Sequence, residues 1–312
     1  MAATDVSVDA VASAPRRAAE AVPAAPMRAP SLLSPRAPRL RAALAQLGWS
    51  LASLGLFASL WEGLWALGLL NPLLLPPPHL FLADLPGTLA YFDRANRIGS
   101  RGGGGGVMPL LATIGWTTLR VTVGLVLGFV GGVLVGALLH YVRLFRNLVL
   151  PTVLLLAPIS PVAWLPEAIF VFGIGDVPAI FLVFITLFFA IALTTSAQIA
   201  AVPVTYLNVA RIMGADTRQT FFRVVLPAIL PGLFMTLRLN LFAAWMVVLI
   251  AEAVGVGSGL GQIVSLARST FNARLSFFTM AIIGLLGFSF DWALRRVQAR
   301  MLWWIAPQGG GR

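Results

Sequence analysis

Long stretches of apolar residues dominate the chain, and short polar segments separate them. A helix needs about 20 apolar residues to cross the hydrocarbon core of a membrane. Six stretches reach that length, which predicts an all-α membrane protein with about six transmembrane helices. The predicted spans are 44–70, 114–139, 148–172, 177–200, 224–250 and 276–297.

The polar segments outside these spans define the expected domain organisation. Residues 1–43 are rich in Ala, Pro and Arg and hold no apolar run long enough to fold, which predicts a disordered basic tail. Residues 44–304 form the predicted transmembrane domain, and residues 305–312 form a short second tail.

Composition excludes several classes of soluble protein and enzyme. Of the 312 residues 59% are hydrophobic and 11% are charged, whereas soluble domains have roughly a quarter of their residues charged. The chain has no Lys and no Cys, which excludes a phosphate-binding P-loop, Schiff-base chemistry and thiol chemistry on this chain. Its two histidines, His79 and His140, are too few for a zinc site without carboxylate help. We therefore expect no catalytic residue, no metal and no cofactor here.

The net charge of +11 is distributed as a topology signal. With the N-terminus in the cytoplasm, the inner segments hold 15 arginines and the outer segments hold 5. This is the positive-inside bias of a multi-pass membrane protein, so nucleic acid is not an expected partner and lipid is. The even number of spans places both termini in the cytoplasm. The inner segments are 1–43, 140–147, 201–223 and 295–312, and the outer ones are 71–113, 173–176 and 251–275.

Small residues recur at every fourth position of the second predicted span. They are Gly124, Gly128, Gly132 and Gly136. This spacing lines one helix face and lets another backbone approach closely in lipid. The stripe predicts a helix-packing seam, either between subunits or within the chain.

Prolines interrupt the third predicted span at Pro151, Pro158, Pro161 and Pro166. Interior prolines break helical hydrogen bonds, and broken backbone at membrane depth is tolerated where it lines a water-filled cavity. The segment is therefore a candidate wall of a transport pathway, with a structural kink as the alternative. Further pathway candidates, each of which could equally serve in helix packing, are Ser160, Trp164, Gln198, Arg238 and Asn240.

Charged residues inside the spans call for partners, because an unpaired charge in a membrane is costly. Asp291 precedes Arg295 by one helical turn, which predicts an ion pair on one face of the last helix. Arg238 either offers hydrogen bonds to an anion or braces the neighbouring cytoplasmic loop. Glu252 is expected at the outer interface, with a part in an outer gate as the alternative.

The cytoplasmic segment 203–227 has the pattern of a helix, a turn and a second helix. A short helix is predicted from Val204 to Met213, and Gly214 supplies its left-handed stop. Asp216 and Gln219 have the spacing of a capping box at the start of the next helix. Apolar side chains beside basic ones predict a protein-binding surface or packing on the chain's own membrane domain. They are Ile212, Met213, Phe221 and Phe222 beside Arg211, Arg218 and Arg223.

The spacing of this segment resembles the coupling loop of ABC importer permeases, whose pattern is EAA-x3-G-x9-I-x-LP. Here Asn208-Val-Ala210 stands for EAA, Gly214 follows after three residues, and Val224-x-Leu226-Pro227 follows after nine more. Asn208 and Val209 depart from the family's Glu and Ala. The resemblance implies a type I permease fold and a loop that sits in a groove of the ATPase subunit. The coupling residues it implies are Asn208, Ala210, Arg211, Gly214, Asp216, Leu226 and Pro227.

Other motifs are similar to those of nitrate, sulfonate and taurine permeases. They include 74–78 (LLPPP), 158–166 (PISPVAWLP), 172–176 (FGIGD) and 258–261 (SGLG). The resemblance implies a permease subunit that forms the pathway for a small anion, such as nitrate or a sulfonate. The implied partners are two ABC ATPase subunits, a second and identical permease subunit, and a periplasmic substrate-binding protein.

Two other functions remain open on the residues alone. A stand-alone channel or an ion-coupled secondary carrier would also need several spans and a broken pathway helix. A non-transporting membrane anchor would need the spans but not the prolines. Neither alternative explains the cytoplasmic segment 203–227.

Overall fold

The computed structural model describes residues 37–69, 71, 73–83, 85–98 and 107–304. Every regular element in these residues is helical, which confirms the predicted all-α class. The predicted tails at 1–43 and 305–312 lie almost wholly outside the described residues. The exception is 37–43, where helix α1 (Ala37–Ala66) already begins.

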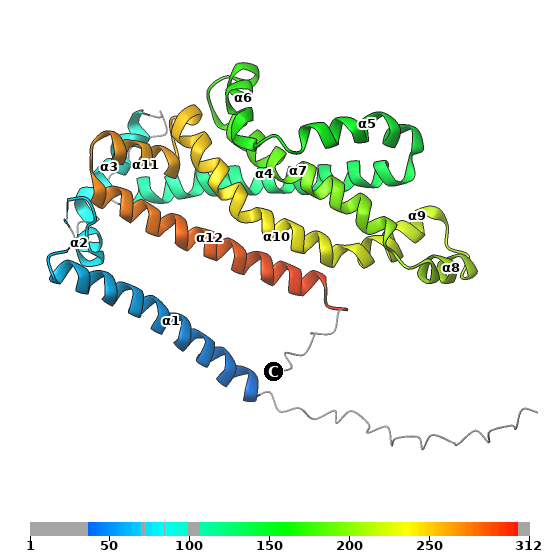
Figure 1. Cartoon of the computed structure of the whole chain (residues 1–312), viewed down its shortest axis with the longest axis horizontal. Helices are drawn as coiled ribbons and strands as arrows, with labels where there is room; N and C mark the ends of the chain where they lie inside the picture. Colours follow the sequence, from blue (N-terminus) through cyan, green and yellow to red (C-terminus); the bar gives the residue numbers. More distant parts are fainter. Residues whose placement is uncertain (1–36, 70, 72, 84, 99–106, 305–312) are drawn as a thin grey trace, which may run out of the picture. The chain divides into compact units, whose positions relative to one another are not determined.

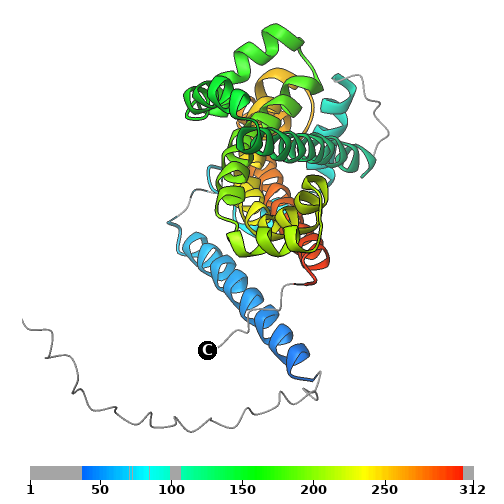
Figure 2. The same cartoon turned by 90° about the vertical axis from the view of Figure 1, so that its right-hand side faces the viewer.

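The chain divides into two units, residues up to Leu56 and residues from Phe57 onward. The described part of the first unit is the N-terminal portion of α1. All remaining helices belong to the second unit, in which α4, α7 and α10 run side by side (Figures 1 and 2). This second unit carries every site described below.

Four helical runs of the second unit are long and apolar enough to cross a membrane. They are Met108–Tyr141, Asp176–Ala200, Thr217–Val256 and Ala273–Met301. Within them lie α4 (Met108–Tyr141), α7 (Asp176–Ala200), α10 (Leu226–Ala251) and α12 (Ala273–Met301). Together with one bent helix pair they make up to five spans among the described residues, where the sequence predicts six. The predicted first span, 44–70, overlaps α1, which is not one of these runs.

The bent pair occupies the predicted third span. α5 (Arg143–Leu156) ends before the proline-rich break, and a 3-10 turn at Pro161–Trp164 leads into α6 (Leu165–Phe172). The two limbs are bent by 98°. Pro151 lies inside α5 without ending it, so the bend comes from the later prolines, which remove helical hydrogen bonds where the chain turns. The interruption predicted for the third span is therefore present, as two helical limbs joined by a 3-10 turn.

The glycine stripe of α4 packs against α7. A Cβ on Gly124 would lie 2.6 Å from the Cβ of Val183, and one on Gly132 would lie 2.7 Å from the Cβ of Ile191. Real side chains do not approach so closely, so the glycines permit contact between the two backbones. The stripe runs for about 18 Å along α4. It therefore serves packing within the chain.

Shorter helices cover one end of the bundle. α2 (Pro78–Ala83), α3 (Leu85–Ile98) and α11 (Leu260–Ser269) pack near the start of α12. Their buried contacts centre on Phe92, Leu260 and Leu275. Two π-helical turns, Phe221–Val225 and Glu252–Val256, flank α10 and were not predicted. π-turns often mark functional positions in helices.

Candidate functional site: the segment between α7 and α10

A closed turn ends the first helix of the segment 203–227. α8 (Val204–Ile212) is followed by Gly214, whose φ is 74°. The Gly214 N–H donates to the Arg211 carbonyl at 3.0 Å, and the Ala215 N–H donates to the Ala210 carbonyl at 3.0 Å. These are the two hydrogen bonds of a Schellman motif, which needs a residue that tolerates positive φ.

A capping box starts the second helix, α9 (Thr217–Thr220). The Asp216 carboxylate accepts from the Gln219 backbone N–H at 2.6 Å, and the Gln219 side chain accepts from the Asp216 N–H at 3.3 Å. The backbone groups at the end of α8 and at the start of α9 thus find hydrogen-bond partners within the segment. These hydrogen bonds hold the shape of the segment without a second protein chain. Such a preformed shape suits a surface that transmits movement.

One side of the segment packs on the bundle. Ala210 and Val225 are buried, and Val225 belongs to a cluster with Ile199 and Leu233. Phe221 packs edge-on against Tyr141 at the end of α4, with ring centroids 5.9 Å apart. Phe221 is half-buried, so this side chain takes the predicted alternative of packing on the chain's own membrane domain.

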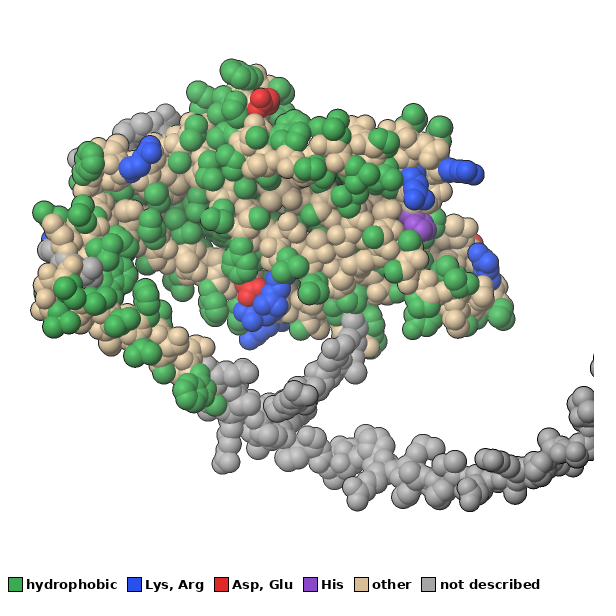
Figure 3. Space-filling model, in the orientation of Figure 1, with side chains coloured by type: hydrophobic (Ala, Val, Ile, Leu, Met, Phe, Trp, Pro, Cys, Tyr) green, Lys and Arg blue, Asp and Glu red, His purple; other side chains and the backbone are tan. Residues whose placement is uncertain are grey.

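The other side of the segment is exposed and apolar. Ile212 is 85% exposed and Met213 is 80% exposed, and Phe222 is also exposed. The three predicted arginines, Arg211, Arg218 and Arg223, are exposed beside them. Figure 3 shows the basic side chains near the end that carries α8 and α9. Apolar groups ringed by positive charge are typical of a protein-binding surface.

The remaining predicted loop residues divide between these two sides. Asn208 and Asp216 are exposed, while Leu226 and Pro227 are half-buried at the start of α10. A cavity of about 210 Å³ lies behind the turn, between the end of α4 and α8. It is lined by His140, Tyr141, Ile199, Leu207, Arg211, Ala215, Thr217, Thr220 and Val225. The loop therefore has room to shift against the bundle.

Helix α10 connects the segment with the rest of the membrane domain. The run Thr217–Val256 continues without a break from α9 through α10. Half-way along α10, the Arg238 Nε donates to Asp291 of α12 at 2.6 Å, and Arg295 contacts the same carboxylate at 2.5 Å. The predicted Asp291–Arg295 pair is present. Arg238 joins it, so its partner is α12.

The other pathway candidates lie apart from one another. Ser160 is exposed at the start of the 3-10 turn, and the buried indole N–H of Trp164 has no hydrogen-bond partner among the described residues. Gln198 of α7 lies against Gly232 of α10. Asn240 donates to the Thr236 carbonyl of its own helix at 2.9 Å.

A polar cluster that the sequence did not predict lies at the far end of α4. Arg120 is fully buried and contacts Glu252 at 2.5 Å and Asp176 at 2.6 Å. Glu252 is also fully buried within the chain. Its expected place at the outer interface, or in an outer gate, stays a prediction. The sequence did contain a signal for this cluster. Single charged residues lie in three largely apolar stretches, and a charge in such a stretch needs a partner. Among the described residues no group of His, Cys, Asp and Glu could hold a metal ion.

Comparison with known families agrees with this architecture. Residues 107–303 match the family of binding-protein-dependent transport system inner membrane components. The chain belongs to this family of ABC importer permeases, whose ATPase is a separate subunit. It is thus a multi-pass inner membrane transport subunit and not an enzyme, and the resemblance seen in the loop motif is confirmed.

Individual relatives extend the match. The chain is 32% identical over 220 residues to a probable ABC transporter permease of Brucella melitensis, covering 70% of this chain and 87% of the relative. It is 26% identical over 262 residues to the taurine transport system permease of Escherichia coli, covering 83% and 90%. It is 30% identical over 178 residues to the nitrate import permease of Synechococcus elongatus, covering 55% and 63%.

The fold has a solved counterpart. A structure of the inward-facing MetNI methionine ABC transporter superposes with a TM-score of 0.54 at 25% identity. The match covers 62% of this chain and 97% of the other chain. The helical bundle is therefore the type I ABC importer permease fold.

Proposed function

We propose that this permease forms the translocation pathway for a small anion, either a nitrate-like oxyanion or a sulfonate such as taurine. Two relatives are named for taurine and for nitrate, and both ligands are small and carry a compact anionic oxygen group. A periplasmic binding protein delivers the anion. Two copies of the chain pair in the membrane, with both termini in the cytoplasm.

The observation that carries the proposal is the segment 203–227. Its Schellman turn and capping box hold Ile212 and Met213 at the surface without help from another chain. Exposing two large apolar side chains to water is unfavourable unless a partner covers them. The ATPase subunit is the partner proposed for this surface.

The coupling mechanism follows from helix continuity. α9, the π-turn and α10 form one run from Thr217 to Val256, so a displacement of the segment moves α10. Arg238 then carries the movement to α12 through Asp291. Closure of the ATPase dimer is proposed to rock these helices as a body and to open the pathway alternately to each side.

Reconstitution tests the proposal. The tagged chain is expressed with a candidate ABC ATPase and a candidate binding protein from the same genome, purified, and placed in liposomes. We expect the ATPase to co-purify, and uptake of labelled nitrate or taurine to require ATP and the binding protein. Uphill uptake by the permease alone, or flux without ATP, contradicts the proposal and favours a channel or an ion-coupled carrier.

The orientation has its own test. A reporter enzyme fused after Arg312 is expected to be active in the cytoplasm. A periplasmic reporter signal contradicts the proposed topology, and with it the cytoplasmic position of the segment 203–227.

A further inference from the structure

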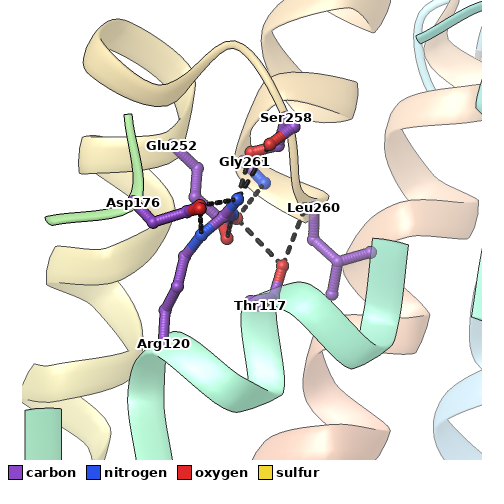
Figure 4. Close-up of polar contacts among 7 residues, drawn as sticks. All are labelled: Thr117, Arg120, Asp176, Glu252, Ser258, Leu260 and Gly261. Atoms are coloured by element: carbon purple, nitrogen blue, oxygen red, sulfur yellow. Dashed lines mark hydrogen bonds and ion pairs between the residues drawn. The ribbon is translucent and has the colours of Figure 1, made fainter. Parts of the chain in front are cut away.

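The guanidinium group of Arg120 makes four hydrogen bonds and one further ion-pair contact (Figure 4). Nε donates to Asp176 at 2.8 Å, and Nη2 lies 2.6 Å from the same oxygen. Nη2 donates to the Ser258 hydroxyl at 2.8 Å. Nη1 donates to the Ser258 carbonyl at 3.0 Å and to Glu252 at 2.5 Å. Each of the three guanidinium nitrogens therefore donates at least one hydrogen bond within the chain.

The Glu252 carboxylate also has several hydrogen-bond partners. Its second oxygen accepts from the Thr117 hydroxyl at 3.1 Å and from the Gly261 N–H at 3.0 Å. A Cβ on Gly259 or on Gly261 would collide with this side chain. The loop from 257 to 261 therefore wraps a buried carboxylate whose counter-charge is Arg120.

Asp176 differs from the other members of the cluster. Its side chain is 33% exposed, whereas those of Arg120 and Glu252 are 0% exposed. Asp176 begins α7 directly after the turn 173–175, where Gly173 has φ 77° and Gly175 has φ 151°. A second polar contact, from the Gly175 N–H to the Gly255 carbonyl at 3.2 Å, joins the same turn to the 252–256 π-turn.

The charges permit two states of this cluster. With Asp176 bound, one arginine faces two carboxylates. With Asp176 released into water, Arg120 and Glu252 remain as a buried neutral pair with their other hydrogen bonds intact. Buried charges are tolerated when paired, so neither state leaves an isolated charge in the interior. Asp176 is thus the one of the three charged residues that is partly exposed to water.

We propose that Arg120 and Glu252 are positioning residues of the outer gate, and that the Arg120–Asp176 contact is its latch. The buried Arg120–Glu252 pair holds the loop 257–261 on α4. The Arg120–Asp176 latch holds the α6–α7 turn against that loop. α6 is the second limb of the bent span. The sequence marks this span as a candidate pathway wall, and in this proposal release of the latch frees that wall at the outer end. The assignment to the outer side rests on the proposed function.

Cysteine labelling tests the latch in the full chain within intact cells. The chain has no natural cysteine, so a single Ala168→Cys provides the reporter. Ala168 lies on α6 and is 2% exposed. The rate of its reaction with a membrane-impermeant maleimide measures opening of the α6–α7 turn. Val177→Cys, at an exposed position beside Asp176, serves as the control for sidedness.

We expect Asp176→Asn to raise the labelling rate of the Ala168→Cys reporter roughly threefold to tenfold, because an amide replaces the charged acceptor of Arg120. Asp176→Glu should recover part of the slow rate. Glu167→Gln is the matched control, since it removes an exposed carboxylate from α6, and it should leave the rate unchanged. High salt should accelerate labelling when Asp176 is present and not in the Asp176→Asn variant, because a partly exposed ion pair is screened.

Two results overturn the proposal. One is Asp176→Asn protein that reaches normal levels in the membrane and labels at the parental rate. The other is Val177→Cys that reacts with the maleimide in inside-out vesicles but not in intact cells, which places the cluster on the wrong side. Neither measurement uses the ATPase or a substrate, so failure of the latch is distinguishable from failure of the transport proposal.

Discussion

The segment 203–227 and the Arg120 cluster lie near opposite ends of α4, and they use arginine differently. Tyr141, which contacts the segment, is about 30 Å along the helix from Arg120. Arg211 and Arg218 are exposed, but Arg120 is fully buried and each of its guanidinium nitrogens donates a hydrogen bond within the chain. The exposed arginines are available to another chain, while the buried one holds its own chain together. Substitutions in the Arg120 cluster should therefore change mainly the stability of the chain, and substitutions in the segment 203–227 should change mainly its coupling to the ATPase.

The largest loss of stability is expected from Arg120→Gln. It leaves the buried Glu252 without its counter-charge, which costs about 3–5 kcal/mol of the free energy of unfolding. Thermal unfolding in detergent measures the loss. Adding Glu252→Gln should restore part of it, because the unpaired charge is removed. An unchanged melting temperature for Arg120→Gln would show that the cluster does not hold this end together.

A smaller loss is expected at the α4–α7 seam that joins the two ends. In Gly132→Ala the new methyl group would lie 2.7 Å from Ile191 Cβ and 2.9 Å from the Phe188 carbonyl oxygen, which forces the helices apart at a cost of about 1–3 kcal/mol. Gly131→Ala is the matched control, since its methyl group finds its nearest atoms at 3.5 Å. The control should be neutral or more stable. Equal melting temperatures for the two variants would contradict close packing of the seam.

These contrasts also explain what the sequence could predict. The Gly214 stop and the Asp216–Gln219 box were predictable because each depends on residues within one or two turns. The helical spans were predictable because hydrophobic length alone defines them. The family followed from the spacing of the loop motif.

The Arg120 cluster was not predictable in the same way. Its ion pairs join residues 56 and 132 positions apart, and no local rule connects them. Phe221 packs against Tyr141 at the end of α4, which is distant along the chain, so no local pattern predicts its half-buried position. The 98° bend likewise depends on packing around the prolines, since their positions predict a break but not its angle.

A still smaller stability effect, but a large effect on coupling, is expected from Gly214→Val. A β-branched residue at φ 74° costs about 1–2 kcal/mol, although the site has space for a Cβ. The expected result is a modest drop in melting temperature with loss of ATP-dependent uptake. Gly214→Asn is the control, because Asn tolerates left-handed backbone, and it should retain most uptake. Full uptake by the Val variant would argue against a role for the turn geometry.

The smallest change in stability is expected for Ile212→Ser combined with Met213→Ser. Both side chains are at least 80% exposed, so their removal should alter the free energy of unfolding by no more than about 0.5 kcal/mol. If the ATPase covers them, the same change removes apolar burial from the interface, and the ATPase should no longer co-purify. Leu239→Ser is the matched control, since Leu239 is 69% exposed on α10 and lies outside the segment. A double variant that loses stability but still binds the ATPase would contradict this assignment. Ile212 and Met213 would then stabilise their own chain and would not form the binding surface.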